Sequence, residues 1–240
     1  MHKVIIAVPS YDGAIDIRAA AQMLRLGAQP SPDISLGLIT QTGSKLPGIR
    51  NELVTEFLKI PEATALLFLD ADVVFRAEDL IRLIRWTEEA DVEMVCGAYR
   101  QKSDETKYIL RLFENRIVHN LSGGLIRITN IGCGFNLITR KVFEKIIEDN
   151  PRFFYKERGR EIRHFFEFKF VETDALYGED YTFCDLVTKS GFKIWVDPMM
   201  TLTHVGKHDF TGTLADIFGG PNEQLPDQKE RQVAPDGDGQ

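Results

Sequence analysis

The sequence has few cysteines, no long apolar run and no excess of positive charge. Its 240 residues include only 3 cysteines, Cys96, Cys133 and Cys184, which lack the paired spacing of a metal site, so buried free thiols are expected. A formal net charge of −7 disfavours a broad nucleic-acid surface. The apolar run before Pro9 is too short for a signal peptide or a membrane span. We therefore expect a cytoplasmic protein with no transmembrane segment.

The composition indicates a folded globular chain. Hydrophobic residues make up 43% and charged residues 27% of the sequence, whereas disordered chains are poorer in apolar residues. The length suits a single α/β domain. We divide this domain into one half over residues 1–100 and a second half over residues 101–212. Residues 213–240 are expected to form a flexible tail, because the stretch from residue 219 onward is rich in Gly, Pro, Asp, Gln and Glu.

Strands and helices are predicted to alternate in the first half, as in a nucleotide-binding unit. The apolar runs over 4–8, 34–40, 65–69 and 92–98 predict strands, and the amphipathic stretches between them predict helices, including 50–59 and 78–90. After Tyr99 the pattern changes to strand-like pieces interrupted by glycines, which predicts a partly antiparallel region. The fold class is therefore α/β, with a mixed sheet flanked by helices and a smaller antiparallel region.

The triplet Asp70-Ala71-Asp72 follows the unbroken apolar run Ala65-Leu66-Leu67-Phe68-Leu69. Such a run is typical of a central strand, and ligands of open α/β sheets bind at the carboxyl ends of the strands. Two carboxylates placed there could bind a divalent cation that a diphosphate also coordinates. The alternative is that both residues only cap the loop and the next helix, since short Asp-x-Asp matches are frequent.

Two further features offer chemistry in the second half. Glu179-Asp180 follows Gly178 at the start of a predicted helix, where an acid is commonly a cap but could also act as a general base. His204 lies in a predicted loop, Thr203 to Lys207, in which Lys207 could meet a phosphate. A solitary histidine is more often structural, although an imidazole beside carboxylates suits manganese better than magnesium.

The order of these motifs resembles GT-A glycosyltransferases, closest to the family 2 type of bacteria and phages. From about Val4 to Gly212 the chain contains, in this order, VIIAVPSYDG, GIRNELVTEFL, LLFLDADVVF, GCGFNLITRKVFEKI, GEDYTFCDLVTKSGFKIWVD and THVGKHDFTG. The resemblance implies a GT-A (Rossmann-like) fold with an acceptor-binding second half. It also implies a nucleotide-sugar donor, and Mn²⁺ or Mg²⁺ as cofactor.

The resemblance also assigns donor residues in the first half. The loop with Pro9, Tyr11 and Asp12 would hold the nucleobase and ribose. In the triplet, Asp70 would lie near the ribose and the metal, with Ala71 beside the nucleotide, and Asp72 would ligate the metal. Arg50 and Asn51 lie where related sequences carry a similar pair near the nucleotide, and a surface salt bridge is the alternative for Arg50.

In the second half, the resemblance makes Asp180 the candidate base, Glu179 an acceptor or sugar contact, and His204 a further metal ligand. The chain lacks the Gln-x-x-Arg-Trp motif and the membrane helices of processive family 2 enzymes. Retaining GT-A enzymes also use Asp-x-Asp with a histidine ligand, so inversion through Asp180 is not fixed by the motifs alone.

The sequence therefore predicts a metal-dependent glycosyltransferase that moves a sugar from a nucleotide sugar to an acceptor hydroxyl. The acceptor could be a glycan, a small molecule such as a lipid, a protein or a modified DNA base. Two alternatives stay open: a phosphohydrolase of the haloacid dehalogenase type, whose nucleophile loop resembles the triplet, and a non-catalytic nucleotide- or sugar-binding module. A nucleotidyltransferase fits less well, because the chain lacks a Gly-rich, Arg-containing N-terminal loop.

Overall fold

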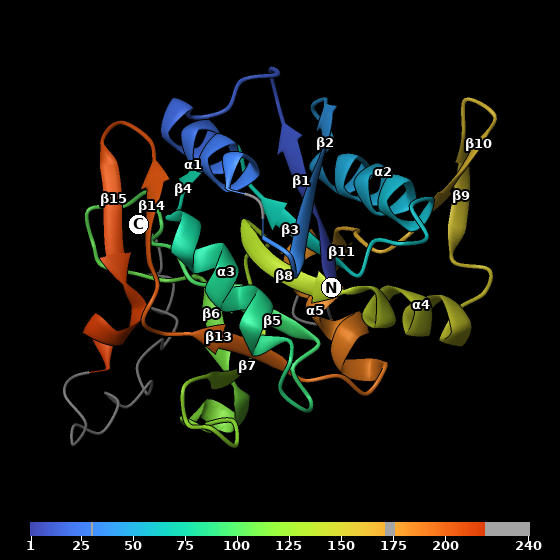
Figure 1. Ribbon diagram of the computed structural model, residues 1–240. Coiled ribbons are helices and arrows are strands. Elements are labelled where there is room, and N and C mark those ends of the chain that lie inside the picture. The colour runs from blue at the N-terminus through green and yellow to red at the C-terminus, as the bar shows by residue number, and fades with distance from the viewer. Residues whose placement is uncertain (30, 171–175, 219–240) are drawn as a thin grey trace, which may run out of the picture.

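A mixed sheet of eight strands runs through the part of the chain that the computed structural model describes, residues 1–29, 31–170 and 176–218 (Figure 1). The order across the sheet is β2 (Ile34–Thr42), β1 (His2–Ser10), β3 (Ala65–Leu69), β8 (Phe135–Thr139), β5 (Met94–Gly97), β13 (Ile194–Asp197), β7 (Ile126–Ile131) and β6 (Leu110–Leu112).

The strands of the first half are joined in a parallel arrangement that the second half interrupts. β1 pairs in parallel with β2 and β3, whereas β8 lies antiparallel between β3 and β5. β5 then pairs in parallel with β13, and β7 and β6 follow as antiparallel strands. The predicted α/β class, with a mixed sheet and a partly antiparallel region, is confirmed. The insertion of β8 means that both halves of the chain build one sheet.

Helices cover both faces of this sheet (Figure 1). On one face, α1 (Ile17–Ala28) and α3 (Ala77–Trp86) pack against the strands in one apolar cluster. On the other face, α2 (Leu46–Leu58), α4 (Arg140–Asp149) and α5 (Glu179–Lys189) share a second cluster. Among the described residues, none of these helices is long and apolar enough to cross a membrane.

The second helix begins earlier than the sequence pattern indicates. We predicted a helix over 50–59, but α2 starts at Leu46 with a proline in its first turn. Proline is tolerated there because the first N–H groups of a helix have no intrahelical partner. The earlier start places Arg50 inside the helix, on its buried side.

Small antiparallel sheets flank the main one. A three-stranded sheet contains β4 (Val73–Val74), β14 (Thr201–Val205) and β15 (Asp209–Thr213). Two ribbons are formed by β9 (Phe154–Glu157) with β10 (Arg160–Arg163), and by β11 (Lys169–Phe170) with β12 (Leu176–Tyr177). Short 3₁₀ turns cover Phe113–Asn115 and Leu214–Ile217.

Two expectations for the C-terminal part differ from the structure. His204 lies in the strand β14, where we expected a loop. The predicted tail boundary at residue 213 falls at the end of β15, and the following turn buries Leu214 in the core. Residues up to 218 therefore belong to the folded part, because one buried leucine anchors the turn. Residues 219–240, the remainder of the expected tail, lie outside the described residues.

Phe183 is predicted to be a major contributor to stability. Its fully buried ring stacks on Phe166 at a centroid distance of 4.4 Å and lies 6.0 Å from the ring of Phe143. Replacing Phe183 by Ala should lower the free energy of unfolding by about 3–5 kcal/mol, through lost burial and a residual cavity. Urea denaturation measures this change. Phe170→Ala is the control, because that ring is 77% exposed and its loss should change stability by about 0.5 kcal/mol or less.

Candidate active site

The Asp70-Ala71-Asp72 triplet forms a tight turn at the carboxyl end of β3. The Val73 N–H donates to the Asp70 carbonyl at 3.0 Å, and the Asp16 N–H donates to the Ala71 carbonyl at 2.8 Å. On the other side, the Asp70 N–H donates to the carbonyl of Gly134 at 3.0 Å. The backbone of the turn is therefore fixed by segments before and after it in the sequence, and its two carboxylates point into different surroundings.

A cavity of about 490 Å³ opens beside this turn. It is lined by Pro9, Ser10, Tyr11, Asp12, Ala14, Ile15, Asp16, Leu46, Asp70, Ala71, Asp72 and Val205. The structure thus brings together five of the residues predicted to bind the donor, from the loop after β1 and the turn after β3, with the predicted metal ligand Asp72. The volume lies within the range of small-molecule sites.

The loop after β1 has a defined conformation. The Oγ of Ser10 accepts from the Gly13 N–H at 2.9 Å and donates to the Ala14 carbonyl at 2.9 Å. The Oδ1 of Asp12 accepts from the Ala14 N–H at 3.0 Å. The side chain of Tyr11, in contrast, is 78% exposed. Its ring is therefore available to stack on a planar group at the mouth of the cavity.

Asp72 faces His204 because β4 pairs with β14. In this pairing His204 is opposite Val73, and the Val205 N–H donates to the Asp72 carbonyl at 2.8 Å. The Nε2 of His204 lies 3.6 Å from the Oδ2 of Asp72, and the Lys102 ammonium contacts the same oxygen. Burial alone would raise the pKa of Asp72, but His204 and Lys102 hold it at about 2.

The tautomer of His204 follows from its other nitrogen. Nδ1 lies 2.9 Å from the carbonyl oxygen of Arg100. A carbonyl only accepts, so Nδ1 carries a proton, and the nitrogen that faces Asp72 is Nε2, which can carry a second proton or bind a metal ion through its lone pair. The ring also packs edge-on against Tyr99, with centroids 4.9 Å apart. Metal-binding histidines generally donate the N–H of the other ring nitrogen to a carbonyl or carboxylate, as Nδ1 of His204 does here.

Asp70 belongs to a buried network centred on Arg50. The Arg50 side chain is 1% exposed, and its Nη2 lies 3.0 Å from the Oδ1 of Asp70. Its Nη1 donates to the Cys133 carbonyl at 3.0 Å and lies 3.4 Å from the Oδ1 of Asp180. Burial raises the pKa of Asp70, and Arg50 opposes that shift. One guanidinium therefore links the end of β3 with the start of α5.

The turn between β7 and β8 lies between Asp70 and Asp180. A Cβ on Gly134 would lie 2.5 Å from the hydroxyl of Tyr99 and 2.8 Å from the Oδ2 of Asp70. A Cβ on Gly132 would lie 2.9 Å from the same hydroxyl. That hydroxyl accepts from the Gly134 N–H at 3.0 Å. Glycine is thus required at both positions for the carboxylates and the tyrosine to approach the turn.

Three other residues that were predicted to contact the donor do not line this cavity. Asn51 is buried, and its amide oxygen accepts from the N–H groups of Phe165 and Phe166 at 2.7 and 2.9 Å, so its side chain fixes that segment. Arg50 has no exposed surface to offer a phosphate, because its neighbours enclose it. Lys207 is exposed in the turn between β14 and β15 and does not line the cavity.

Glu179 is 6% exposed and lies beside Asp180 in the first turn of α5. Burial and the adjacent carboxylate of Asp180 raise the pKa of Glu179, with Arg50 opposing the shift. The Oδ1 of Asp180 is buried and has no hydrogen bond within the described residues. Glu179 and Asp180 thus form a pair of carboxylates. Within the described residues, the cation that offsets their charge is the guanidinium of Arg50, which also pairs with Asp70.

The residues around Asp72 fit a divalent cation as a pair of ligands. The separation of 3.6 Å between Nε2 of His204 and Oδ2 of Asp72 is too long for a hydrogen bond. It suits two ligands of one ion, for which bonds of about 2.1 Å give about 3.0–3.6 Å between ligand atoms. Among the described residues, no third His, Cys, Asp or Glu joins them. Asp70 in particular is turned toward Arg50.

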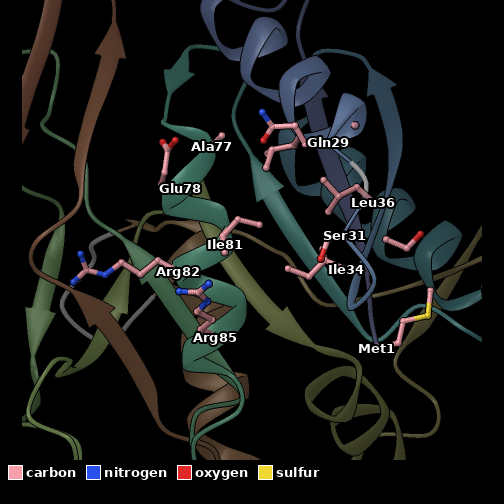
Figure 2. A pocket seen from close by; sticks show the side chains of 13 residues that line it. Met1, Gln29, Ser31, Ile34, Leu36, Ala77, Glu78, Ile81, Arg82 and Arg85 are labelled. Carbon is pink, nitrogen blue, oxygen red and sulfur yellow. The ribbon is translucent and has the colours of Figure 1, made fainter.

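A larger cavity of about 960 Å³ lies between α1, β2 and α3 (Figure 2). Ile34 and Leu36 line it from the first residues of β2, so it lies at the amino end of the parallel strands. Its arginines come from α3, and Arg82 is already paired with the buried carboxylate of Asp197. Because ligands of open α/β sheets bind at the carboxyl ends, the smaller cavity is the better candidate active site.

No protein-family model matches the sequence, and no curated protein matches it. Among solved structures, A197 from STIV is similar at a TM-score of 0.56 and 18% identity, covering 97% of this chain and 100% of that chain. That likeness shows a shared fold. A glycosyltransferase involved in the glycosylation of the major capsid of PBCV-1 matches 62% of this chain and 66% of its own at 12% identity. Its TM-score of 0.33 is too low to support an assignment.

The mixed sheet flanked by helices, with small antiparallel sheets, is consistent with a GT-A fold.

Two residues that the motif analysis did not select also shape the candidate site. Asp16 lines the cavity and caps α1 by accepting from the Arg18 N–H at 2.9 Å. Tyr99 separates His204 from the glycine turn. The signal for Asp16 was the cap before a helix, and Tyr99 is marked by its place just after the buried run over 92–98.

Arg50 is predicted to be required for stability. Arg50→Met leaves the carboxylates of Asp70 and Asp180 partly buried without a cation, and should lower the free energy of unfolding by about 3–5 kcal/mol near neutral pH. Unpaired carboxylates have a higher pKa folded than unfolded, so the loss should shrink as the pH falls and grow as it rises. Urea denaturation between about pH 5 and pH 8 measures both effects.

The matched control for this prediction is Arg18→Met. Arg18 also bridges two carboxylates, those of Asp16 and Asp209, but its side chain is 44% exposed. Because solvent screens an exposed ion pair, its removal should lower stability far less than Arg50→Met does. Equal stabilities of the two variants, or a loss in Arg50→Met that does not depend on pH, would contradict the role given to the buried guanidinium.

Proposed function

We propose that the protein is a glycosyltransferase that moves a sugar from a nucleotide-sugar donor to an acceptor hydroxyl. The observation that carries the proposal is the meeting of three elements at the carboxyl end of β3. The loop after β1 and the Asp70–Asp72 turn line one cavity, and Arg50 ties Asp70 to Asp180. The cavity that would hold the nucleotide and the carboxylate that would accept a proton thus lie on either side of one turn.

The donor would bind across the loop and the turn. The exposed ring of Tyr11 would stack on the nucleobase, and the free oxygen of Asp12 would accept from the base or ribose. Pro9 and Ala71 supply part of the apolar wall of the cavity. The phosphates would extend toward Asp72 and His204, while Lys207 lies in the exposed turn after β14.

Asp72 and His204 would hold a Mn²⁺ or Mg²⁺ ion, and Asp70 would contribute through a water molecule. When bound, such an ion offsets the negative charge that develops on the leaving diphosphate. Manganese is the better match, because an imidazole nitrogen accompanies the carboxylate. Both residues are held in place without the ion, by the pairing of β4 with β14 and by the contact of Nδ1 with Arg100.

Asp180 would act as the general base of a single displacement. Its carboxylate takes the proton of the acceptor hydroxyl, the acceptor oxygen bonds to the anomeric carbon, and the bond from that carbon to the phosphate oxygen breaks. The nucleoside diphosphate leaves, and the configuration is inverted. Arg50 fixes the carboxylate through Oδ1, and Glu179 would contact the acceptor, which could be a glycan, a small molecule or a modified DNA base.

The phosphohydrolase alternative is less well supported. It requires Asp70 as a nucleophile, but the Oδ1 of Asp70 is paired with a buried guanidinium and its side chain is 23% exposed. It also gives no role to His204 or Asp180. Release of inorganic phosphate from a phosphomonoester, with no effect of nucleotide sugars on thermal stability, would favour that alternative.

The proposal predicts which variants lose transfer. A panel of nucleotide sugars, with Mn²⁺ or a chelator, is screened by thermal shift and by nucleotide release. At least one donor should raise the melting temperature and release nucleotide only when Mn²⁺ is present. With that donor, Asp180→Asn should lower turnover by at least about a hundredfold while nucleotide binding changes little, because the lost group acts as a base.

Asp91→Asn is the control, because Asp91 is an exposed acid that pairs with Lys193 away from the cavity. It should leave turnover unchanged. Substantial turnover by Asp180→Asn would remove Asp180 as the base. If no nucleotide sugar stabilises the protein and none is cleaved or transferred, the proposed function is wrong.

A further inference from the structure

The carboxylate of Asp72 is already in contact with a cation of the chain itself. The Lys102 ammonium contacts the Oδ2 of Asp72, which is also the oxygen facing the Nε2 of His204. The two side chains are partly exposed, at 38% for Lys102 and 42% for Asp72. The position from which a divalent ion would contact Asp72 therefore borders directly on a positive charge.

The backbone around Lys102 holds it in this place. The segment after β5 closes on itself, since Arg100 bridges to Tyr108 and the Gln101 N–H donates to the Lys107 carbonyl at 2.8 Å. The carbonyl of Arg100 is also the acceptor for Nδ1 of His204. One short hairpin thus fixes the ring of His204 and carries Lys102.

The aliphatic part of Lys102 lies across the turn after β14. A Cβ on Gly206 would lie 3.2 Å from the Cδ of Lys102 and 3.5 Å from its Cγ. The absence of a side chain at Gly206 leaves room for the lysine to reach Asp72 over this turn. Because the side chain of Lys102 is 38% exposed, rotation of the side chain alone can move the charge away from Asp72.

We infer that Lys102 occupies the cation position at Asp72 and that a divalent ion binds there only by displacing it. This inference rests on the proposed function for its choice of metal site. Two cations cannot both lie against one carboxylate oxygen without strong repulsion, so binding of the ion requires the ammonium to leave. The released ammonium would remain close enough to approach a diphosphate on the same ion. Lys102 would then link occupation of the metal site to donor binding.

The test is direct titration of the full-length protein with MnCl₂, without nucleotide, by isothermal calorimetry and by the electron paramagnetic resonance of free Mn²⁺. Lys102→Met keeps the apolar stem and removes the charge, and should lower the dissociation constant for Mn²⁺ by about tenfold. Lys107→Met is the matched control. Lys107 lies in the same hairpin but pairs with the exposed Glu105, so its loss should leave the constant unchanged.

The double variant Asp72→Asn with Lys102→Met shows whether the gain acts through Asp72, and it should bind Mn²⁺ no more tightly than the wild type. Thermal unfolding without metal verifies that each variant is folded. Equal affinities of wild type and Lys102→Met, or no Mn²⁺ binding by either, overturn the inference. A gain of equal size in Lys107→Met also overturns it, because it would reflect net charge alone.

Failure of this inference can be told apart from failure of the proposed function. Nucleotide release from the donor panel is measured on the same proteins. Tighter Mn²⁺ binding by Lys102→Met without turnover of any nucleotide sugar supports the inference and contradicts the transferase function. Turnover that needs Mn²⁺, together with equal affinities of wild type and Lys102→Met, supports the function and overturns the inference.

Discussion

The buried guanidinium of Arg50 is the interaction on which the candidate active site depends. A charge that is 1% exposed is tolerated only when it is paired and hydrogen-bonded. Arg50 meets this condition with partners from three places, the end of β3, the turn between β7 and β8, and the start of α5. These segments are far apart in the sequence, so their relative positions follow from the requirement to neutralise one cation.

The same requirement explains the small residues around the network. The carbonyl of Cys133 must face Arg50, while the hydroxyl of Tyr99 and the carboxylate of Asp70 approach the backbone of the turn. Any side chain at Gly134 would collide with both groups, because its Cβ would lie less than 3 Å from each. Close packing therefore explains the glycines on both sides of Cys133. The thiol of Cys133 is buried, and among the described residues it belongs to no cluster of potential metal ligands.

The sequence allowed the strand end and its acids to be predicted, because both depend on local pattern. An unbroken apolar run indicates a central strand, and the residue after it must lie at the edge of the sheet. The neighbours of these acids were not predictable in this way. His204 lies beside Asp72 through the pairing of β4 with β14, and β4 is a strand of only two residues. No periodicity is visible in so short a segment.

The burial of Arg50 and Asn51 could not be predicted for a related reason. Both lie in α2, whose start the pattern placed too late, and polar residues near a helix start are usually exposed. Their burial is decided by distant partners, Asp180 for Arg50 and the backbone of Phe165 and Phe166 for Asn51. A pattern read along one helix contains no information about a carboxylate supplied by another.

The two acids of the triplet can have different roles because the turn separates their surroundings. Asp70 shares one buried cation with Asp180, in a group whose second acid, Glu179, is also shielded from water. This group has more carboxylates than cations, and burial raises the pKa of both Asp70 and Glu179. Asp72 faces an imidazole and an ammonium at the open side, and its pKa is about 2. An anionic carboxylate at the open side suits an exchangeable cation, whereas the buried acids suit proton transfer and fixed geometry. A change of charge at Asp72 can therefore take place in solvent without disturbing the pairing of Arg50 that holds the structure of the site.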